Sequence, residues 1–320
     1  MDMKQYKKAG IVACSNGLPK HAHAEMEQLK QRLEERGIEA VFSDYIYRKD
    51  GVRSGTAKER AEALMEFYQN PEIDVIFDVS GGDIGNEVLL YLDFQVIEEV
   101  RNEKGAPKEF WGYSDLTVLL NGIYQKTGNP GMLYQVRNLI EVKEATSKQL
   151  DEGNSRVAEF RSFEVPETKE ELLDTRYHFV QGDTMSGVAV GGNIRCLLKL
   201  AGTEYFPDMS HKILFLEALN GLEPQIRTYF AQLKQLGVFE QIAGLYVGTF
   251  TQWEKEMQKM HTGKGKLQGE ESCGEKHPFV VEQLIKEYVP ASLPVARTCE
   301  IGHAPDSKAL YIGKEITLSV

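Results

Sequence analysis

The sequence predicts an α/β fold in which strands of parallel sheets alternate with helices, arranged as two domains. Short apolar runs of strand length are separated by segments whose apolar residues recur at helical spacing. This alternation is typical of parallel sheets covered by helices on both faces. The chain has 320 residues, which is enough for two domains, and a polar stretch divides it near the middle.

The first domain is expected to span residues 1–142. A capping box marks one of its helix starts, because Thr56 is followed three residues later by Glu59. In chain order we expect a strand at 9–15, a helix at 21–36, a strand at 40–42, a helix from 57, a strand at 74–79, a helix from 86, a strand ending at 112 and a helix from 116.

Two turns of this domain follow strands, at the sheet edge where ligands of parallel sheets bind. One is the glycine-rich segment 80–85, SGGDIG, and the other is the segment 112–115, GYSD. Ser114 then lies at the apex of a strand–turn–helix unit, with its hydroxyl near the free N–H groups of a helix N-terminus. Ser114 also fits the N-cap position of that helix, so both interpretations stay open.

Residues 143–182 are polar and predict a linker or mobile segment with one short helix near 168–174. The second domain is expected to span residues 183–320, and its polar segment 254–277 is interpreted as a surface insertion. Whether 143–182 and 254–277 act as lids is left open. The expected strands are at 187–193, 212–217, 242–250 and 294–299. One helix is expected to end at 202, and two more are expected at 224–236 and 279–288.

Composition narrows the classes of function. The net charge of −11 argues against a nucleic-acid partner or an anionic membrane surface. No apolar run reaches the length of a membrane span, and the N-terminal segment lacks the apolar core of a secretion signal, so a cytoplasmic location is expected. The cysteines form no CxxC pair and are expected to be free thiols; they are Cys14, Cys196, Cys273 and Cys299. Neither a metal nor a cofactor is expected.

Three residues with complementary chemistry each fall at a strand end: Ser114, Glu217 and His303. A serine hydroxyl becomes a nucleophile when an imidazole takes its proton, and a carboxylate orients and stabilises that imidazole. The order Ser, acid, His is the one found in α/β-hydrolases. The turn at Gly81 and Gly82 could supply a second backbone N–H beside that of Asp115, which would form an oxyanion hole.

Each member also has a plain structural interpretation. Glu217 could make a buried structural hydrogen bond, His303 could be a turn or core histidine, and Gly81-Gly82 could be only a tight turn. The remaining histidines have no ligand-like neighbours and are expected to be non-catalytic: His21, His23, His178, His211, His261 and His277.

These residues resemble the LD-carboxypeptidases, serine peptidase family S66, which include the microcin C7 self-immunity proteins. The resemblance covers most of the chain, and its most specific motif is GYSDLT at 112–117. The other matching segments are SGTAKERA at 54–61, GG at 81–82, GGN at 191–193, GT at 202–203, LE at 216–217, GVF at 237–239 and GH at 302–303.

The resemblance implies Ser114 as the nucleophile, Glu217 as the acid, His303 as the base, and Gly82 (or Gly81) with Asp115 as main-chain oxyanion donors. It also implies a flavodoxin-like N-terminal domain, a smaller swivelling C-terminal α/β domain, a site between them and a homodimer. The chain departs from the family pattern at three places, which leaves the substrate open. It has GNPGM at 128–132 in place of a Tyr-Gly-Pro, YIG at 311–313 in place of a Pro-x-Gly, and no tryptophan in residues 143–190.

The function expected from these observations is that of a serine carboxypeptidase. The expected substrate is a small peptide or muropeptide, with cleavage of the L,D-amide that releases D-Ala from a murein tetrapeptide. One alternative is an aminoacyl-nucleotide peptide of the microcin C7 type. Another is a non-catalytic nucleotide- or anion-binding protein, because SGGDIG at 80–85 differs from a dinucleotide fingerprint only at its first glycine. A degenerate, inactive family member is the third.

Overall fold

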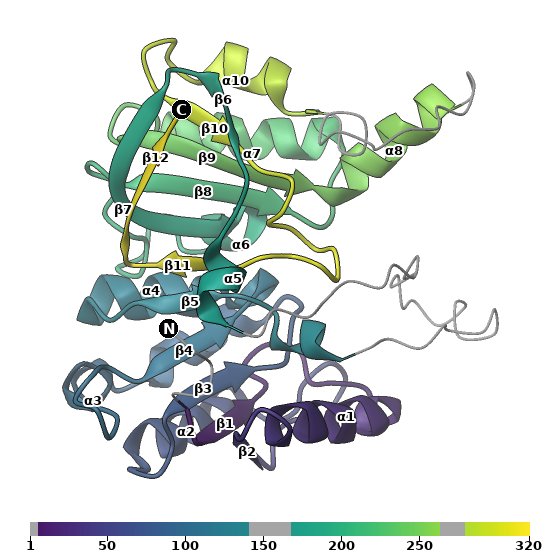
Figure 1. Cartoon of the computed structure of the whole chain (residues 1–320), viewed down its shortest axis with the longest axis vertical. Helices are drawn as coiled ribbons and strands as arrows, with labels where there is room; N and C mark the ends of the chain where they lie inside the picture. The colour runs from purple at the N-terminus through teal and green to yellow at the C-terminus, as the bar shows by residue number, and fades with distance from the viewer. Residues whose placement is uncertain (1–5, 141–167, 263–278) are drawn as a thin grey trace.

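The computed structural model describes residues 6–140, 168–262 and 279–320, which form two α/β layers stacked one on the other (Figure 1). Each layer is built on a six-stranded sheet. The expected linker 143–182 and the expected insertion 254–277 lie partly outside the described residues.

The first sheet has the strand order β11-β5-β4-β3-β1-β2. Strands β1 to β5 run parallel in the order 2-1-3-4-5, which is the flavodoxin-like order and confirms the predicted fold class. β11 comes from the far end of the chain and pairs antiparallel with β5. The strands are β1 (Lys8–Val12), β2 (Glu39–Phe42), β3 (Val75–Asp78), β4 (Glu109–Gly112), β5 (Gly131–Leu133) and β11 (Leu310–Ile312).

The helices between these strands follow the predicted alternation. The capping box at Thr56 and Glu59 is formed and begins α2. The helices are α1 (His23–Glu34), α2 (Ala57–Gln69), α3 (Phe94–Glu99) and α4 (Thr117–Thr127), with 3-10 segments η2 (Lys20–Ala22), η3 (Gly85–Tyr91), η4 (Ser114–Leu116) and η5 (Val136–Leu139). The segment from residue 86, which was expected to be an α-helix, forms the 3-10 helix η3.

The second sheet has the strand order β12-β7-β8-β9-β10-β6, with four parallel central strands and antiparallel edges. The strands are β6 (His178–Gln181), β7 (Thr184–Asn193), β8 (Ile213–Ala218), β9 (Gly244–Phe250), β10 (Val295–Arg297) and β12 (Glu315–Ser319). The helices are α5 (Lys169–Leu173), α6 (Ile194–Leu198), α7 (Glu223–Gln235), α8 (Thr251–Thr262) and α10 (Glu282–Tyr288).

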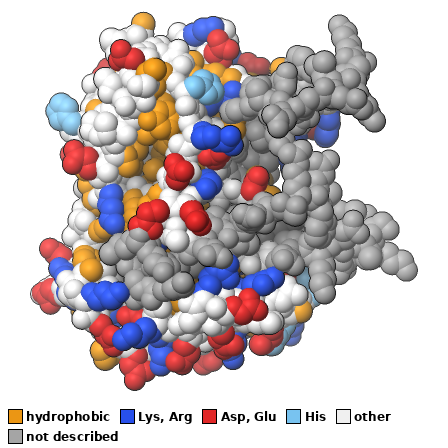
Figure 2. Space-filling model, viewed as in Figure 1, with side chains coloured by type: hydrophobic (Ala, Val, Ile, Leu, Met, Phe, Trp, Pro, Cys, Tyr) orange, Lys and Arg blue, Asp and Glu red, His pale blue; other side chains and the backbone are white. Residues whose placement is uncertain are grey.

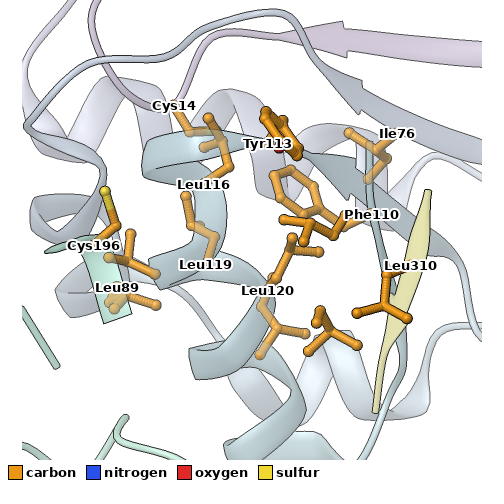
Figure 3. Close-up of a cluster of buried hydrophobic side chains, with 14 of the residues drawn as sticks. Cys14, Ile76, Leu89, Phe110, Tyr113, Leu116, Leu119, Leu120, Cys196 and Leu310 are labelled. Carbon is orange, nitrogen blue, oxygen red and sulfur yellow. The ribbon is translucent and has the colours of Figure 1, made fainter. Parts of the chain in front are cut away.

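Helix α4 lies at the junction of the two layers. Leu116, directly before α4, and Leu119 and Leu120 within it lie in one buried cluster with Phe110 of the first sheet and Cys196 of α6 (Figure 3). One hydrophobic cluster runs continuously from the first sheet through α4 to residues of β7 and α6. Because this core crosses the junction, the position of the second layer is tied to the helix that follows Ser114.

Two local features add to or correct the expectations. Residues 251–262, which overlap the start of the expected insertion 254–277, form α8, because Trp253 and Met257 lie four residues apart and bury one face of a helix against the core. Cys299 is bonded in a disulfide, so a free thiol there is not found. Free thiols were expected because the sequence suggests a reducing compartment, and such an argument does not show which cysteines lie close enough to bond. Cys14 and Cys196 are free and buried as expected, and Cys273 lies outside the described residues.

The surface differs between the two layers. On the face in Figure 2, hydrophobic side chains gather over the second sheet, whereas Lys, Arg, Asp and Glu are interspersed over the first. Among the described residues, no helix has both the length and the apolar character needed to cross a membrane.

A buried ion pair joins α5 to the first sheet. The Nζ of Lys169 on α5 lies 2.8 Å from Glu109 Oε2 on β4 and donates to the Tyr311 hydroxyl on β11 at 2.9 Å. Tyr6 and Trp111 also donate to Glu109. Burial favours the neutral acid, but Lys169 and these donors hold the pKa of Glu109 below its usual value. The carboxylate is therefore charged and depends on its partners.

We expect Lys169→Met to lower the free energy of unfolding by about 3 kcal/mol, because it leaves the Glu109 carboxylate buried without a cation. Urea unfolding at pH 7 measures this difference. The matched variant Lys169→Met/Glu109→Gln has no buried charge and should recover most of the loss. A single variant within about 0.5 kcal/mol of the wild type would contradict this account.

Candidate active site

The turn that carries Ser114 is tight and strained. Ser114 has a φ of 57°, a left-handed conformation that costs a non-glycine residue about 1–2 kcal/mol. Gly112 is required two residues earlier, since a Cβ there would lie 2.6 Å from the Cβ of Leu116. Strain of this kind persists where the surrounding structure holds it and is common at functional sites.

Ser114 does not act as a helix cap in this structure. The N-cap positions of η4 and α4 are Tyr113 and Leu116, and neither helix start has a side-chain cap. No hydrogen bond of the Ser114 hydroxyl is recorded within the described residues. The geometry thus favours the strand–turn–helix apex over the N-cap interpretation.

Glu217 and His303 come together across the ends of β8 and β10. The imidazole Nδ1 lies 2.7 Å from Glu217 Oε2, although the angle at this contact is poor for a hydrogen bond. Glu217 is fully buried, and its other oxygen accepts from Asn193 Nδ2 at 3.1 Å. The carboxylate therefore faces one side of the imidazole, while the opposite nitrogen, Nε2, is buried without a hydrogen-bond partner.

Tyr113 positions the loop that carries His303. Its ring meets the imidazole edge-on, with centroids 4.9 Å apart, and its hydroxyl donates to the Gly302 carbonyl at 2.5 Å. Burial and the nearby Glu217 carboxylate raise the pKa of Tyr113 well above its ordinary value, so the hydroxyl keeps its proton and remains a donor.

The predicted trio meets at one cavity of about 160 Å³. Ser114 and His303 both line it, and Glu217 lies behind His303. The lining comes from the segments that follow β3, β4, β5, β8 and β10, which is the carboxyl edge of both sheets. No hydrogen bond between Ser114 and His303 Nε2 is formed in this structure. Such a contact is often absent until substrate binds.

The glycine turn after β3 also lines the cavity. Gly82 has a φ of 132°, and a Cβ there would lie 2.2 Å from Asn16 Cγ, so only glycine fits. Within the described residues no hydrogen bond of the main-chain N–H of Gly82 or Asp115 is recorded. Gly82 lines the cavity, and Asp115 directly follows the lining residue Ser114.

The same turn is not arranged like a dinucleotide site. The N–H of Gly85, which would face a pyrophosphate at the start of a helix, donates instead to the Asp115 carboxylate at 2.8 Å. The segment that follows is 3-10 η3 rather than an α-helix. This geometry argues against the nucleotide-binding interpretation of 80–85.

Asp115 connects the serine turn to the second layer. Its buried carboxylate accepts from Ser15 Oγ at 2.6 Å and forms an ion pair with Lys199, which follows α6. Burial raises the pKa of Asp115, but Lys199 and the neutral donors hold it below its usual value. Arg195 of α6 adds a bond to the Gly82 carbonyl at 2.9 Å and an ion pair with Asp83.

The sequence analysis gave no role to several residues of this arrangement, although two of them fall in its motifs: Tyr113 and Asn193 within motifs, and Arg195, Lys199 and, on the cavity wall, Arg137 outside them. Their neighbours offered a signal, because Tyr113 precedes Ser114 and Asn193 ends the glycine-rich segment 191–193. Within the described part of the chain, no group of three or more His, Cys, Asp or Glu residues could hold a metal ion.

The fold and the cavity together place the protein among two-domain α/β proteins with a polar site at the carboxyl ends of their strands. Comparison with known families makes this specific. The model of the LD-carboxypeptidase N-terminal domain matches residues 9–135, and that of the LD-carboxypeptidase C-terminal domain matches residues 186–318. The chain therefore belongs to the LD-carboxypeptidase family, the S66 serine peptidases.

Individual relatives agree with this assignment. The chain is 30% identical over 238 residues to the microcin C7 self-immunity protein MccF of Escherichia coli, covering 68% of this chain and 67% of MccF. It is 28% identical over 295 residues to a probable murein peptide carboxypeptidase of Bacillus subtilis, covering 90% and 82%. An MccF-like protein of Bacillus anthracis has the same fold, with a TM-score of 0.73 at 23% identity and coverage of 100% and 95%.

We expect Lys199→Met to destabilise the protein by about 3 kcal/mol at pH 7, because the Asp115 carboxylate loses its cation while staying buried. With Lys199 present, the pKa of Asp115 is lowered, so the ionised carboxylate stabilises the folded protein at pH values above the ordinary carboxyl pKa. This stabilisation is lost as the pH falls through the lowered pKa. Without Lys199, burial raises that pKa, and protonation relieves the buried charge. The deficit should therefore shrink as pH is lowered towards 3.

Urea unfolding of both proteins at several pH values measures this. Arg195→Met is the matched control, because Arg195 pairs with a largely exposed Asp83 and should cost about 1 kcal/mol or less. A Lys199→Met deficit that is the same at every pH would show that the Asp115 charge is not its cause.

Proposed function

We propose that the protein is a serine carboxypeptidase that cleaves the L,D-amide bond next to a peptide C-terminus and releases D-Ala from a murein tetrapeptide. The observation that carries the proposal is the 2.7 Å contact between Glu217 and His303, beside a serine held at the apex of a strained turn in the same cavity. Family membership supports the peptidase class.

In the proposed acylation step, Ser114 Oγ attacks the scissile carbonyl carbon and its proton passes to His303 Nε2. Glu217 stabilises the imidazolium through its contact with Nδ1. The carbonyl oxygen becomes an oxyanion, which the main-chain N–H groups of Gly82 (or Gly81) and Asp115 stabilise. The tetrahedral intermediate collapses when His303 gives the proton to the leaving nitrogen. D-Ala departs, and the remaining peptide is esterified to Ser114.

In the proposed deacylation step, a water molecule gives a proton to His303 Nε2 and attacks the ester carbon. The second oxyanion occupies the same N–H donors. His303 then returns the proton to Ser114 Oγ, so the shortened peptide leaves with a new carboxylate and the enzyme is restored. The buried, unpartnered Nε2 of His303 supports this role, because both steps need a nitrogen that is free to exchange a proton.

An aminoacyl-nucleotide peptide of the microcin C7 type is the second candidate substrate, favoured by the 30% identity to MccF. The proposed chemistry at the carbonyl is the same for both substrates. Turnover of the two substrates by one preparation of enzyme separates them, since the preferred one should have the larger kcat/KM.

Other features stay predictions. They are the domain bounds 1–142, 143–182 and 183–320, a swivelling movement of the second domain, a homodimer, a cytoplasmic location and the absence of nucleic-acid partners.

We expect Ser114→Ala to fold normally and to release D-Ala at least about 10⁴-fold more slowly than the wild type, because no other nucleophile is proposed for the cavity. The measurement is D-Ala release from purified tetrapeptide, together with the melting temperature of both proteins. Near-normal turnover by a folded Ser114→Ala protein would exclude the mechanism. Labelling of Ser114 by a reactive organophosphonate would exclude an inactive family member.

A further inference from the structure

The cavity beside Ser114 has an uneven distribution of charge. Among its described lining residues, Arg137 is the single permanently charged side chain, and no carboxylate lines it. Gln135 and Asn138 lie on the same wall and are neutral. A cavity with one fixed cation and no anion favours a ligand group with a negative charge.

Two hydrogen bonds hold Arg137 in place. It belongs to η5, directly after β5, and its main-chain N–H donates to the Gln135 side chain at 3.3 Å. One guanidinium nitrogen, Nη2, donates to Glu25 Oε2 on α1 at 2.5 Å. The Arg137 side chain is 15% exposed, whereas that of Glu25 is 40% exposed.

The rest of the guanidinium has unused hydrogen-bonding capacity. Nε is buried and has no partner, and no bond of Nη1 is recorded within the described residues. A buried donor without an acceptor is unfavourable, so an acceptor supplied by a ligand would relieve that cost. A carboxylate suits this role, because its two oxygens can accept from adjacent guanidinium N–H groups at once.

The size of the cavity limits what can lie beyond the reacting bond. The cavity is small, with a volume of about 160 Å³. That space accepts one small residue more readily than a further length of peptide. The Arg137 guanidinium, which lines this cavity, would therefore lie close to the C-terminal residue of the substrate.

We propose that Arg137 binds the C-terminal carboxylate of the substrate and thereby restricts the enzyme to the last residue of a peptide. The proposal rests on the proposed carboxypeptidase function and adds to it the residue that selects the chain end. Arg137 acts on binding and position, whereas Ser114, His303 and Glu217 carry the bond-breaking chemistry.

The test compares the tetrapeptide L-Ala-γ-D-Glu-diaminopimelate-D-Ala with the same peptide ending in a D-alaninamide, which has no terminal charge. For the wild type, kcat/KM should be on the order of 10- to 100-fold lower for the amide. Arg137→Gln should lose a similar factor on the free acid, mainly through KM, and should no longer distinguish the two peptides.

Two control variants separate charge from structure. Glu25→Gln breaks the same ion pair but keeps the cation, so it should retain the preference for the free acid. Arg32→Gln changes an arginine on α1 that pairs with Glu35 outside the cavity, and it should behave as the wild type. If Arg137→Gln slows both peptides by the same factor, or if Glu25→Gln also abolishes the preference, Arg137 has only a structural role and the proposal is wrong.

Binding measured without turnover keeps the two proposals apart. In the Ser114→Ala background, calorimetry should give tighter binding for the free acid than for the amide, and adding Arg137→Gln should remove the difference. Equal binding of both peptides by Ser114→Ala would overturn the role of Arg137. Failure of the proposed function itself appears elsewhere, as D-Ala release that Ser114→Ala does not reduce.

Discussion

The buried carboxylate of Asp115 is the constraint on which the rest of the site depends. It is the residue directly after Ser114, and it is held by Ser15, by the N–H of Gly85 and by Lys199. These partners come from the ends of β1 and β3 and from the second layer. One charged group therefore joins three loops around the serine turn. Because a buried carboxylate is costly without partners, the turn at Ser114 cannot relax its left-handed φ without breaking them.

A second connection runs from the serine helix to the catalytic pair proposed here. Thr117, at the start of α4, accepts a hydrogen bond from the main-chain N–H of Asn193 at 3.0 Å, and the Asn193 side chain donates to Glu217. Glu217 in turn faces His303. Each link is short and mostly buried, so the distance between the serine and the imidazole depends on how the two layers pack around α4.

The sequence predicted the parts of the structure that depend on local pattern. The alternation of strands and helices, the turn at Ser114 and the strand-end positions of Glu217 and His303 followed from apolar runs and the turn residues between them, whereas the flavodoxin-like strand order was implied by the family resemblance. Contacts across the layers could not be predicted in this way. Lys199 follows a short helix like any surface lysine, and only the stacking of the sheets shows that it meets Asp115. The short strands β6 and β11 were missed for the same reason, since pairing with distant strands defines them.

The central claim is that Ser114, His303 and Glu217 act on one carbonyl group. A crystal structure of Ser114→Ala with an intact tetrapeptide bound tests it most directly. We predict that the scissile carbon lies within about 3.5 Å of the position that the Ser114 hydroxyl would occupy, with its oxygen facing the N–H groups of Gly82 and Asp115. A tetrapeptide bound outside this cavity, or with its scissile carbonyl turned away from residues 114 and 303, would contradict the account.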